Sequence, residues 1–131
     1  MTENFSPEEK LVRACWPKLI KKSGKVSSAA FKPRQMQDGK FEGVSVFRTH
    51  TRTLDDTVKN LIPRFNAGSR FVYITVLLCT EIGVYIKNTS GNSTDYHVEI
   101  YSHDPDIPLT PEESKMLADA AIVYTVNVES A

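Results

Sequence analysis

The sequence has no long hydrophobic run and only two cysteines. Its longest apolar stretch, Phe71 to Cys79, is too short to span a bilayer. The opening segment MTENFSPEEK is acidic and polar where a signal peptide needs a basic region followed by an apolar one. Cys15 belongs to no CxxC pair, nor does Cys79, so we expect buried free thiols rather than a disulfide framework. These absences predict a cytoplasmic protein with no membrane partner.

The chain also has no excess charge of either sign, but its charges are unevenly distributed. Residues 1–70 hold 14 Lys and Arg against 7 Asp and Glu, and residues 71–131 hold 2 against 9. Between Lys10 and Gln37 there are eight basic residues and no acidic one. Such a patch could contact phosphates, but modules dedicated to nucleic acids are usually basic throughout. We therefore favour packing of the basic half beside the acidic half, within one fold or across two copies.

A helix-start signal occurs twice. The segment SPEEK offers Ser6 as N-cap, Pro7 at the first helical position and Glu9 at the third. This pattern predicts a helix that ends before Pro17, because the residue before a proline avoids helical angles. The segment TPEESKMLADAA repeats the signal and predicts a helix over 111–121. The side chains expected to face inward from this helix are Met116, Leu117 and Ala120.

A third helix is predicted over 54–65, where apolar residues recur at the helical period. Asp55 and Asp56 suit the positive end of the helix dipole. Pro63 interrupts the pattern late, so we expect a distorted last turn, and the segment 66–68 supplies a stop.

Apolar residues that alternate with polar ones predict the strands. FVYITVLLC is almost wholly apolar and is expected to be a central strand buried on both faces. KVSSAAF is either a strand or an extended arm. The expected strands are GVSVFRTH (43–50), FVYITVLLC (71–79), GVYIK (83–87), TDYHVEIYSHD (94–104) and IVYTVNV (122–128).

The order of these elements predicts an α+β fold, with a mixed or antiparallel sheet of five or six strands and about three helices packed on it. By length, residues 1–131 form a single globular domain, and we expect residues 1–6 to be a flexible N-terminus.

One expected strand carries the best chemical candidates. Alternation places His97, Glu99, Tyr101 and His103 on one face, with the apolar side chains on the other. An imidazole beside a carboxylate suits acid–base catalysis or a divalent metal, so His97 and Glu99 are the candidate catalytic residues. No third or fourth ligand can be identified from spacing, and we expect neither a metal nor a cofactor. The simpler interpretation, which we favour, is a solvated strand face.

Several familiar signatures are incomplete. KSGKVSSAAFKPR lacks the spacing of a phosphate-binding P-loop, and there is no G-x-S-x-G elbow. HVE matches the H-x-E of zinc deaminases, but the required P-C-x-x-C does not follow. A binding role could still fall on Trp16, although a lone tryptophan is more often a core or rim anchor, and on the basic segment. The candidate binding residues are Trp16, Lys21, Lys22, Lys25, Lys32 and Arg34.

Three blocks, GKVSSAAFKPR, GVSVF and HVEI, resemble a group of short uncharacterised bacterial proteins. Their pattern runs G-x-V-[ST]-S-x-A-F-[KR]-P, then L-S-V, then H-A-x-I. This chain departs from the pattern at Val44, which replaces the leucine, and at Val98, which replaces the alanine. The resemblance implies a single bacterial cytoplasmic domain and no particular activity. It singles out His97, which falls on a motif position.

We rank three functions. The first is a non-enzymatic accessory protein that docks a protein partner or forms a homo-oligomer, because the charge is polarised and no catalytic constellation is complete. The second is a small enzyme or ligand-binding domain centred on His97, with Glu99 orienting the imidazole and Arg34 or Arg48 holding an anion. The third is nucleic-acid binding through the basic segment 10–37.

Overall fold

The computed structural model describes residues 5–66, 68–89 and 96–125, which form a sheet covered by helices. The strands are β1 (Lys10–Cys15), β2 (Val44–Arg48), β3 (Arg70–Thr75), β4 (Tyr85–Asn88), β5 (His97–Tyr101) and β6 (Ile122–Val123). The α-helices are α1 (Leu54–Leu61), α2 (Val76–Ile82) and α3 (Pro111–Ala120), and the 3₁₀ turns are η1 (Pro17–Leu19), η2 (Ser28–Phe31) and η3 (Ile62–Arg64).

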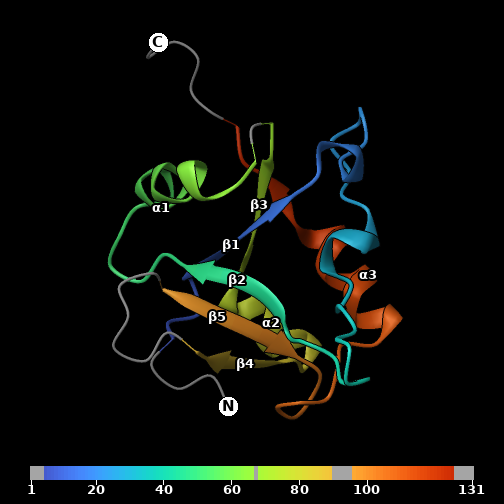
Figure 1. Cartoon of the computed structure of the whole chain (residues 1–131). Helices are drawn as coiled ribbons and strands as arrows, with labels where there is room; N and C mark the ends of the chain where they lie inside the picture. Colours follow the sequence, from blue (N-terminus) through green and yellow to red (C-terminus); the bar gives the residue numbers. More distant parts are fainter. Residues whose placement is uncertain (1–4, 67, 90–95, 126–131) are drawn as a thin grey trace.

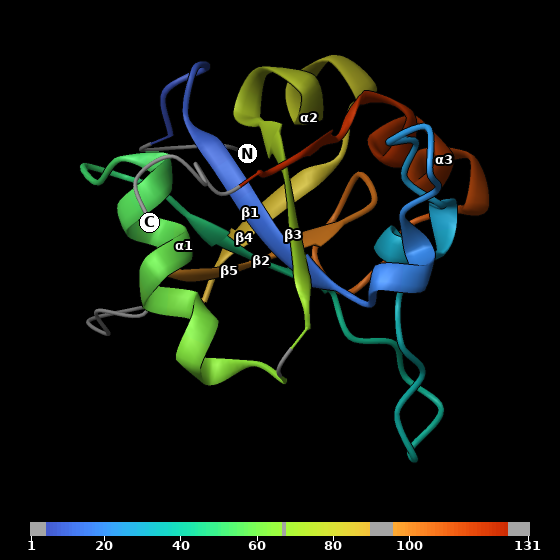
Figure 2. The same cartoon turned by 90° about the horizontal axis from the view of Figure 1, so that it is seen from above.

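The six strands form one sheet in the order β4-β5-β2-β1-β3-β6, and every neighbouring pair is antiparallel. Helix α1 lies against one face of the sheet, while α2, α3 and the segment with η1 and η2 lie on the other (Figures 1 and 2). The single α+β domain expected from the sequence is therefore confirmed, with an antiparallel sheet of six strands and three α-helices in the described residues.

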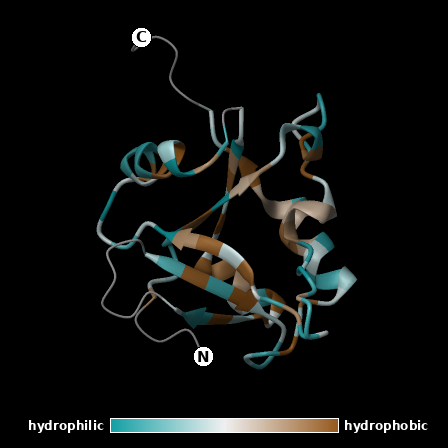
Figure 3. Ribbon diagram, in the orientation of Figure 1, coloured by the Kyte–Doolittle hydropathy of each residue, from teal (hydrophilic) through white to brown (hydrophobic). Residues whose placement is uncertain are grey.

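The sheet separates two hydrophobic cores. The larger one includes Leu11, Val46 and Ile100 from the strands, with Phe31 from η2 and Leu117 from α3. The smaller one lies under α1. Strand β5 shows the alternation plainly, with polar and apolar bands following one another (Figure 3). Alternate residues of β5 therefore face the large core, and its polar row faces the other side.

The helix expected from Pro7 is instead strand β1. Leu11 and Val12 are adjacent in sequence and both are fully buried, one in each core. A strand can bury consecutive residues on opposite faces, because successive side chains alternate. Pairing of β1 with both β2 and β3 therefore outweighs the local helix-start signal. In place of a helix, the segment forms a turn in which the Glu9 amide donates to the Ser6 carbonyl.

The apolar segment 71–79 is not one long strand. Strand β3 ends at Thr75, whose hydroxyl accepts a hydrogen bond from the Leu78 amide and so caps α2. Gly83, with φ of 90°, ends that helix in the left-handed conformation. The segment 25–31 is also neither strand nor arm over its length: Val26 forms an isolated bridge, and η2 follows.

The two other helices agree with the sequence. Helix α1 passes into η3 at the position where Pro63 predicts a distorted turn. Helix α3 begins with the expected capping box of Thr110 and Glu113. Its inward face was expected to include Met116 and Ala120, but both are exposed, whereas Leu117 is fully buried as expected. The face is set by packing of α3 on η2, and the other side chains that it buries are Ser114 and Ala118.

The remaining expectations concern the chain ends and one loop. Residues 1–4 of the expected N-terminal arm, residues 90–95 of the loop after β4 and residues 126–128 of the last expected strand lie outside the described residues. Strand β6 itself covers only Ile122–Val123. No helix in the described part of the chain combines the length and apolar character needed to cross a membrane.

Candidate functional site

The first candidate is His97, at the start of β5. Its strand register places it opposite Phe47, and the two rings meet edge to face at 5.4 Å. The Thr89 hydroxyl donates to the His97 carbonyl at 3.0 Å, and its oxygen lies 2.7 Å from Nδ1 of the same residue. His97 therefore lies against an aromatic ring and a hydroxyl rather than at the edge of any of the three pockets described below.

Glu99 lies on the same face of β5, but its carboxylate is hydrogen-bonded to another side chain of the strand. The Tyr101 hydroxyl donates to Oε1 of Glu99 at 2.7 Å. Burial, and then the hydrogen bond to this carboxylate, raise the pKa of Tyr101 to about 12. The expected alternation along β5 is thus confirmed, but the hydrogen bonds assign Glu99 to Tyr101 rather than to the imidazole. His103 lies beyond the strand. Its side chain is exposed, and its Nε2 atom lies 3.6 Å from Oδ2 of Asp104.

Glu99 and Tyr101 line a pocket of about 640 Å³, called here the polar pocket. The other residues that line it are Met36, Lys40, Phe41, Glu42, Asp106 and Pro108. Its acidic side chains do not assemble into a metal site: within the described residues, no group of three or more His, Cys, Asp or Glu side chains could hold a metal ion.

The basic segment is divided among different places. Lys21, Lys22 and Lys25 are exposed on the turn that follows Ile20, where the Lys21 amide donates to the Lys25 carbonyl. Helix α3, which carries Glu112, Glu113 and Asp119, packs beside the uncharged turn η2 of this segment. None of the ion pairs formed between described residues joins residues 1–70 to residues 71–131.

Lys32 lies at a second hollow, of about 560 Å³, between η2 and the turn before α3. We call it the proline groove, because three prolines contribute to its walls. The residues that line it include Lys32, Pro33, Phe41, Pro108, Leu109 and Pro111. Phe41 and Pro108 also line the polar pocket, so these two residues separate the two hollows. Arg34 follows on the segment 34–42, which projects from the body of the molecule (Figure 2).

Trp16 lies at a third hollow, of about 340 Å³, at the end of β1. We call it the arginine pocket. The residues that line it include Arg13, Cys15, Trp16, Leu19, Asn66 and Ser69. Trp16 is 59% exposed, so it is a rim residue rather than a core anchor. The binding residues expected from the sequence thus divide among the arginine pocket, the lysine turn and the proline groove.

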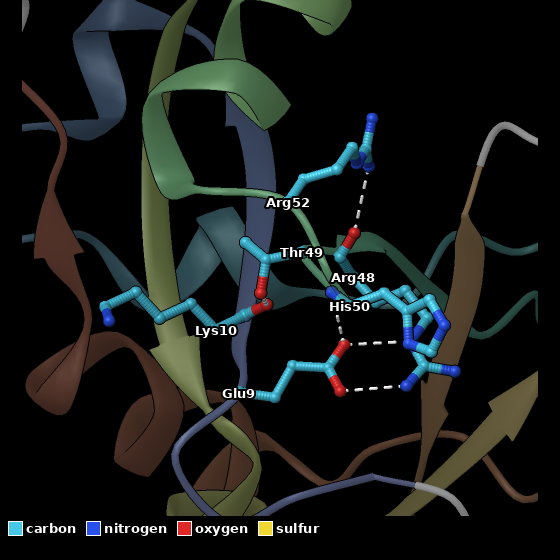
Figure 4. Close-up of polar contacts among 6 residues, drawn as sticks. All are labelled: Glu9, Lys10, Arg48, Thr49, His50 and Arg52. Carbon is cyan, nitrogen blue, oxygen red and sulfur yellow. Dashed lines mark hydrogen bonds and ion pairs between the residues drawn. The ribbon is translucent and has the colours of Figure 1, made fainter.

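A buried polar cluster joins the start of β1 to the end of β2 (Figure 4). The Glu9 carboxylate accepts two hydrogen bonds from the Arg48 guanidinium, each 2.8 Å long, and a third from the His50 amide at 3.0 Å. Arg52 donates to the Arg48 carbonyl, and its guanidinium carbon lies 4.1 Å from the centre of the Tyr96 ring. Arg48 was a candidate anion holder, and the anion that it holds is Glu9 of the same chain.

Sequence reasoning missed Arg13 and the walls of the proline groove. Arg13 looks like one more cation of a basic segment, yet it stands between Val12 and Ala14 inside a strand. A charged residue flanked by apolar ones in a central strand is the signal that could have identified it. The groove joins residues around Pro33 to residues around Pro108, which are too far apart in sequence for local patterns to connect.

Comparisons of the chain with protein-family models, with curated proteins and with solved structures found no match. The resemblance to short bacterial proteins stays a prediction, and the functional argument depends on the geometry of the described residues.

Proposed function

We propose that this protein is a small, non-catalytic interaction domain that docks a segment of a partner protein in the proline groove. The observation that carries the proposal is the groove itself, which combines an exposed aromatic side chain, three prolines and a single charged residue. Proline walls have no backbone N–H to offer, and the Ser114 hydroxyl in the lining already donates to the Phe31 carbonyl, so recognition in the groove depends mainly on contact with apolar side chains.

Large apolar side chains are unusually exposed around the groove. Phe41 is 39% exposed, Met36, which lines the adjoining polar pocket with Phe41, is 37% exposed, and Ile107, which precedes Pro108 in the chain, is 39% exposed. Single exposed apolar residues are ordinary on protein surfaces, but several of them around adjoining hollows are typical of an interaction site. Covering this group would remove apolar area from water, which is the main favourable term in most protein association.

The charge at the groove specifies the partner further. Lys32 is the one charged side chain among the described residues that line it, and Arg34 follows two residues later. A partner segment with a large apolar side chain next to an Asp or Glu would therefore fill the hollow and meet a cation at its rim. Such charge complementarity mainly increases the association rate and the selectivity.

Selection from a displayed random-peptide library tests the proposal. The folded protein should enrich peptides in which a large apolar residue stands beside an acidic one. A Phe41→Ser variant should lose at least about tenfold in affinity for those peptides, as truncation of a central aromatic anchor does. A Trp16→Ser variant, altered at the arginine pocket, should keep the affinity. Failure to enrich any sequence, or equal binding by the Phe41→Ser variant, would reject the groove as the docking site.

Two charge-reversal variants test separately the two parts of the selected peptides, the apolar anchor and the acidic neighbour. Lys32→Glu should shift the selected peptides from acidic to neutral or basic flanks, while the apolar anchor remains. Lys22→Glu, on the exposed lysine turn, is the matched control and should leave the selection unchanged. Sedimentation of the protein alone decides whether the occupant is a second copy, because Phe41→Ser would then dissociate the dimer.

Nucleic-acid binding is a second candidate, supported by the three exposed lysines of one short turn. Phosphate contacts make affinity fall steeply as salt rises. A gel-shift titration at two salt concentrations tests this candidate, and replacement of Lys21, Lys22 and Lys25 by alanine should reduce the slope. A response that does not change with salt would reject it.

A further inference from the structure

Arg13 occupies a split in the sheet. Strands β1 and β2 pair only through Leu11 and Val12, and beyond that point they diverge (Figure 1). The Arg13 side chain bridges the gap: Nη1 donates to the Ser45 carbonyl of β2 at 2.6 Å, and Nε donates to the Ala30 carbonyl of η2. Two backbone carbonyls that would otherwise lack these donors are thereby satisfied.

Among the described residues, no carboxylate balances the charge of Arg13. It forms no ion pair with them, whereas Arg48, which is directed into the same face of the sheet, binds Glu9. Burial lowers the pKa of Arg13, which reflects the cost of keeping a cation away from water. Carbonyl dipoles offset only part of that cost, so an anion that reached the guanidinium would be strongly favoured.

The guanidinium is accessible from the arginine pocket. Its third nitrogen, Nη2, makes no hydrogen bond to any described residue, and Arg13 lines the pocket. No acidic side chain is found among the described residues that line this hollow. Arg70 adds a further positive charge nearby, since it is the register partner of Cys15 on β3. The floor of the pocket is therefore electropositive.

The rim of the pocket offers a different surface. Trp16 is largely exposed there, Asn66 and Ser69 add polar side chains to the lining, and Leu19 and Phe65 add apolar ones. An indole face stacks on planar rings in a way that tolerates many ring types. A volume of about 340 Å³ lies at the lower end of the range for small-molecule sites, which favours a ligand of mononucleotide size.

We propose that the arginine pocket binds a small ligand with an anionic group attached to a planar ring, its anion on Arg13 and its ring on Trp16. The anionic group is a phosphate or a carboxylate, because both accept charge-assisted hydrogen bonds from guanidinium. This site shares only Ala29 with the lining of the proline groove and does not depend on the proposed docking function. No chemical step is assigned to it.

Trp16 is the only tryptophan of the chain, so its fluorescence reports on this pocket alone. The full-length protein is titrated with adenosine monophosphate, with benzoate, with inorganic phosphate and with adenosine. We expect a saturable change with adenosine monophosphate or benzoate, and weaker binding of phosphate and of adenosine, each of which offers only half of the ligand. Adenosine monophosphate alone would identify the phosphate source, and benzoate alone the carboxylate source. Absence of saturable binding by both would overturn the proposal.

Calorimetry with variants separates ligand binding from folding. Trp16→Leu changes an exposed side chain and should weaken binding about 5-fold to 100-fold, the range for loss of one stacking contact. Arg13→Lys keeps the charge but loses the planar fork and should weaken binding about 10-fold. Lys22→Ala, which lies outside the pocket, is the control and should bind as the parent does. Equal affinity in the Trp16→Leu variant, whose fold is not in question, would refute the site even if Arg13→Lys proved unstable.

Discussion

Gly43 lies directly beneath the ring of Tyr101. A Cβ atom built on Gly43 would approach Cε2 and Cζ of that ring to 2.7 Å and Cβ of Glu99 to 2.8 Å, closer than real Cβ atoms come to other atoms. The hydrogen atom of a glycine is thus what permits the ring to lie against the backbone. The Tyr101 ring in turn lines the polar pocket, where its hydroxyl donates to Glu99.

Replacement of Gly43 by alanine should therefore destabilise the fold by about 1–3 kcal/mol, the usual cost of forcing an extra carbon into a packed site. Urea denaturation measures the change. In a Tyr101→Ala background the ring is gone, and the same substitution should cost clearly less, so the two changes should be coupled in a double-mutant cycle. Additive costs would show that the ring does not set the requirement for glycine.

The buried pair of Glu9 and Arg48 leads to a second prediction. Their side chains are only 4% and 6% exposed, so Glu9→Gln removes the negative charge that the buried guanidinium contacts at 2.8 Å. We expect a loss of about 3–5 kcal/mol in the free energy of unfolding. Replacing both by apolar residues, Glu9→Leu with Arg48→Met, should cost less than Glu9→Gln alone. The exposed pair of Lys115 and Asp119 is the control, and Lys115→Ala should leave the denaturation midpoint nearly unchanged.

The two capping signals show what could be predicted from the sequence. TPEES begins helix α3 as expected, because the ten residues of Pro111–Ala120 can bury one side and leave the other in water. SPEEK has the same signal, but the residues after it lie between two strands and must bury both faces. Local chemistry is identical in the two cases, and long-range pairing decides between them. A single sequence does not reveal that pairing.

The candidate sites show the same contrast between what local sequence patterns predict and what long-range pairing decides. Alternation along β5 correctly placed Val98 and Ile100 in the core and Glu99 on the polar face, since that information is local. The partners are not local: Phe47 meets His97 through the register of β2, and the Arg13 guanidinium reaches Ala30 and Ser45 through a split in the sheet.

The two thiols supply a third prediction. Both cysteines are buried and free, and burial raises the pKa of each, that of Cys79 to about 12. The thiolate is the reactive form, so neither should react rapidly with a disulfide reagent near neutral pH while the protein is folded. Cys15 lines the arginine pocket and should be modified before Cys79. Cys15→Ser and Cys79→Ser variants assign the two phases, and full reaction in urea is the control. Rapid modification of Cys79 in the native state would contradict the described burial.

The ionisation of Tyr101 supplies the last prediction. Its pKa is raised from 10.0 to about 12, first by burial and then by the hydrogen bond to the Glu99 carboxylate, which favours the neutral phenol. Because the folded pKa is the higher one, the contribution of Tyr101 to stability is complete below pH 10 and is lost as pH rises from there through about 12. Of the five tyrosines, Tyr124 also has a raised pKa, because its hydroxyl donates to Asp55, so ultraviolet titration of the tyrosinate band should show more than one late ionisation. Tyr101→Phe should reduce the amplitude of the late phase by one tyrosine, and Glu99→Gln should move that part of it to lower pH. A late phase of unchanged amplitude in Tyr101→Phe would show that Tyr101 does not contribute to it.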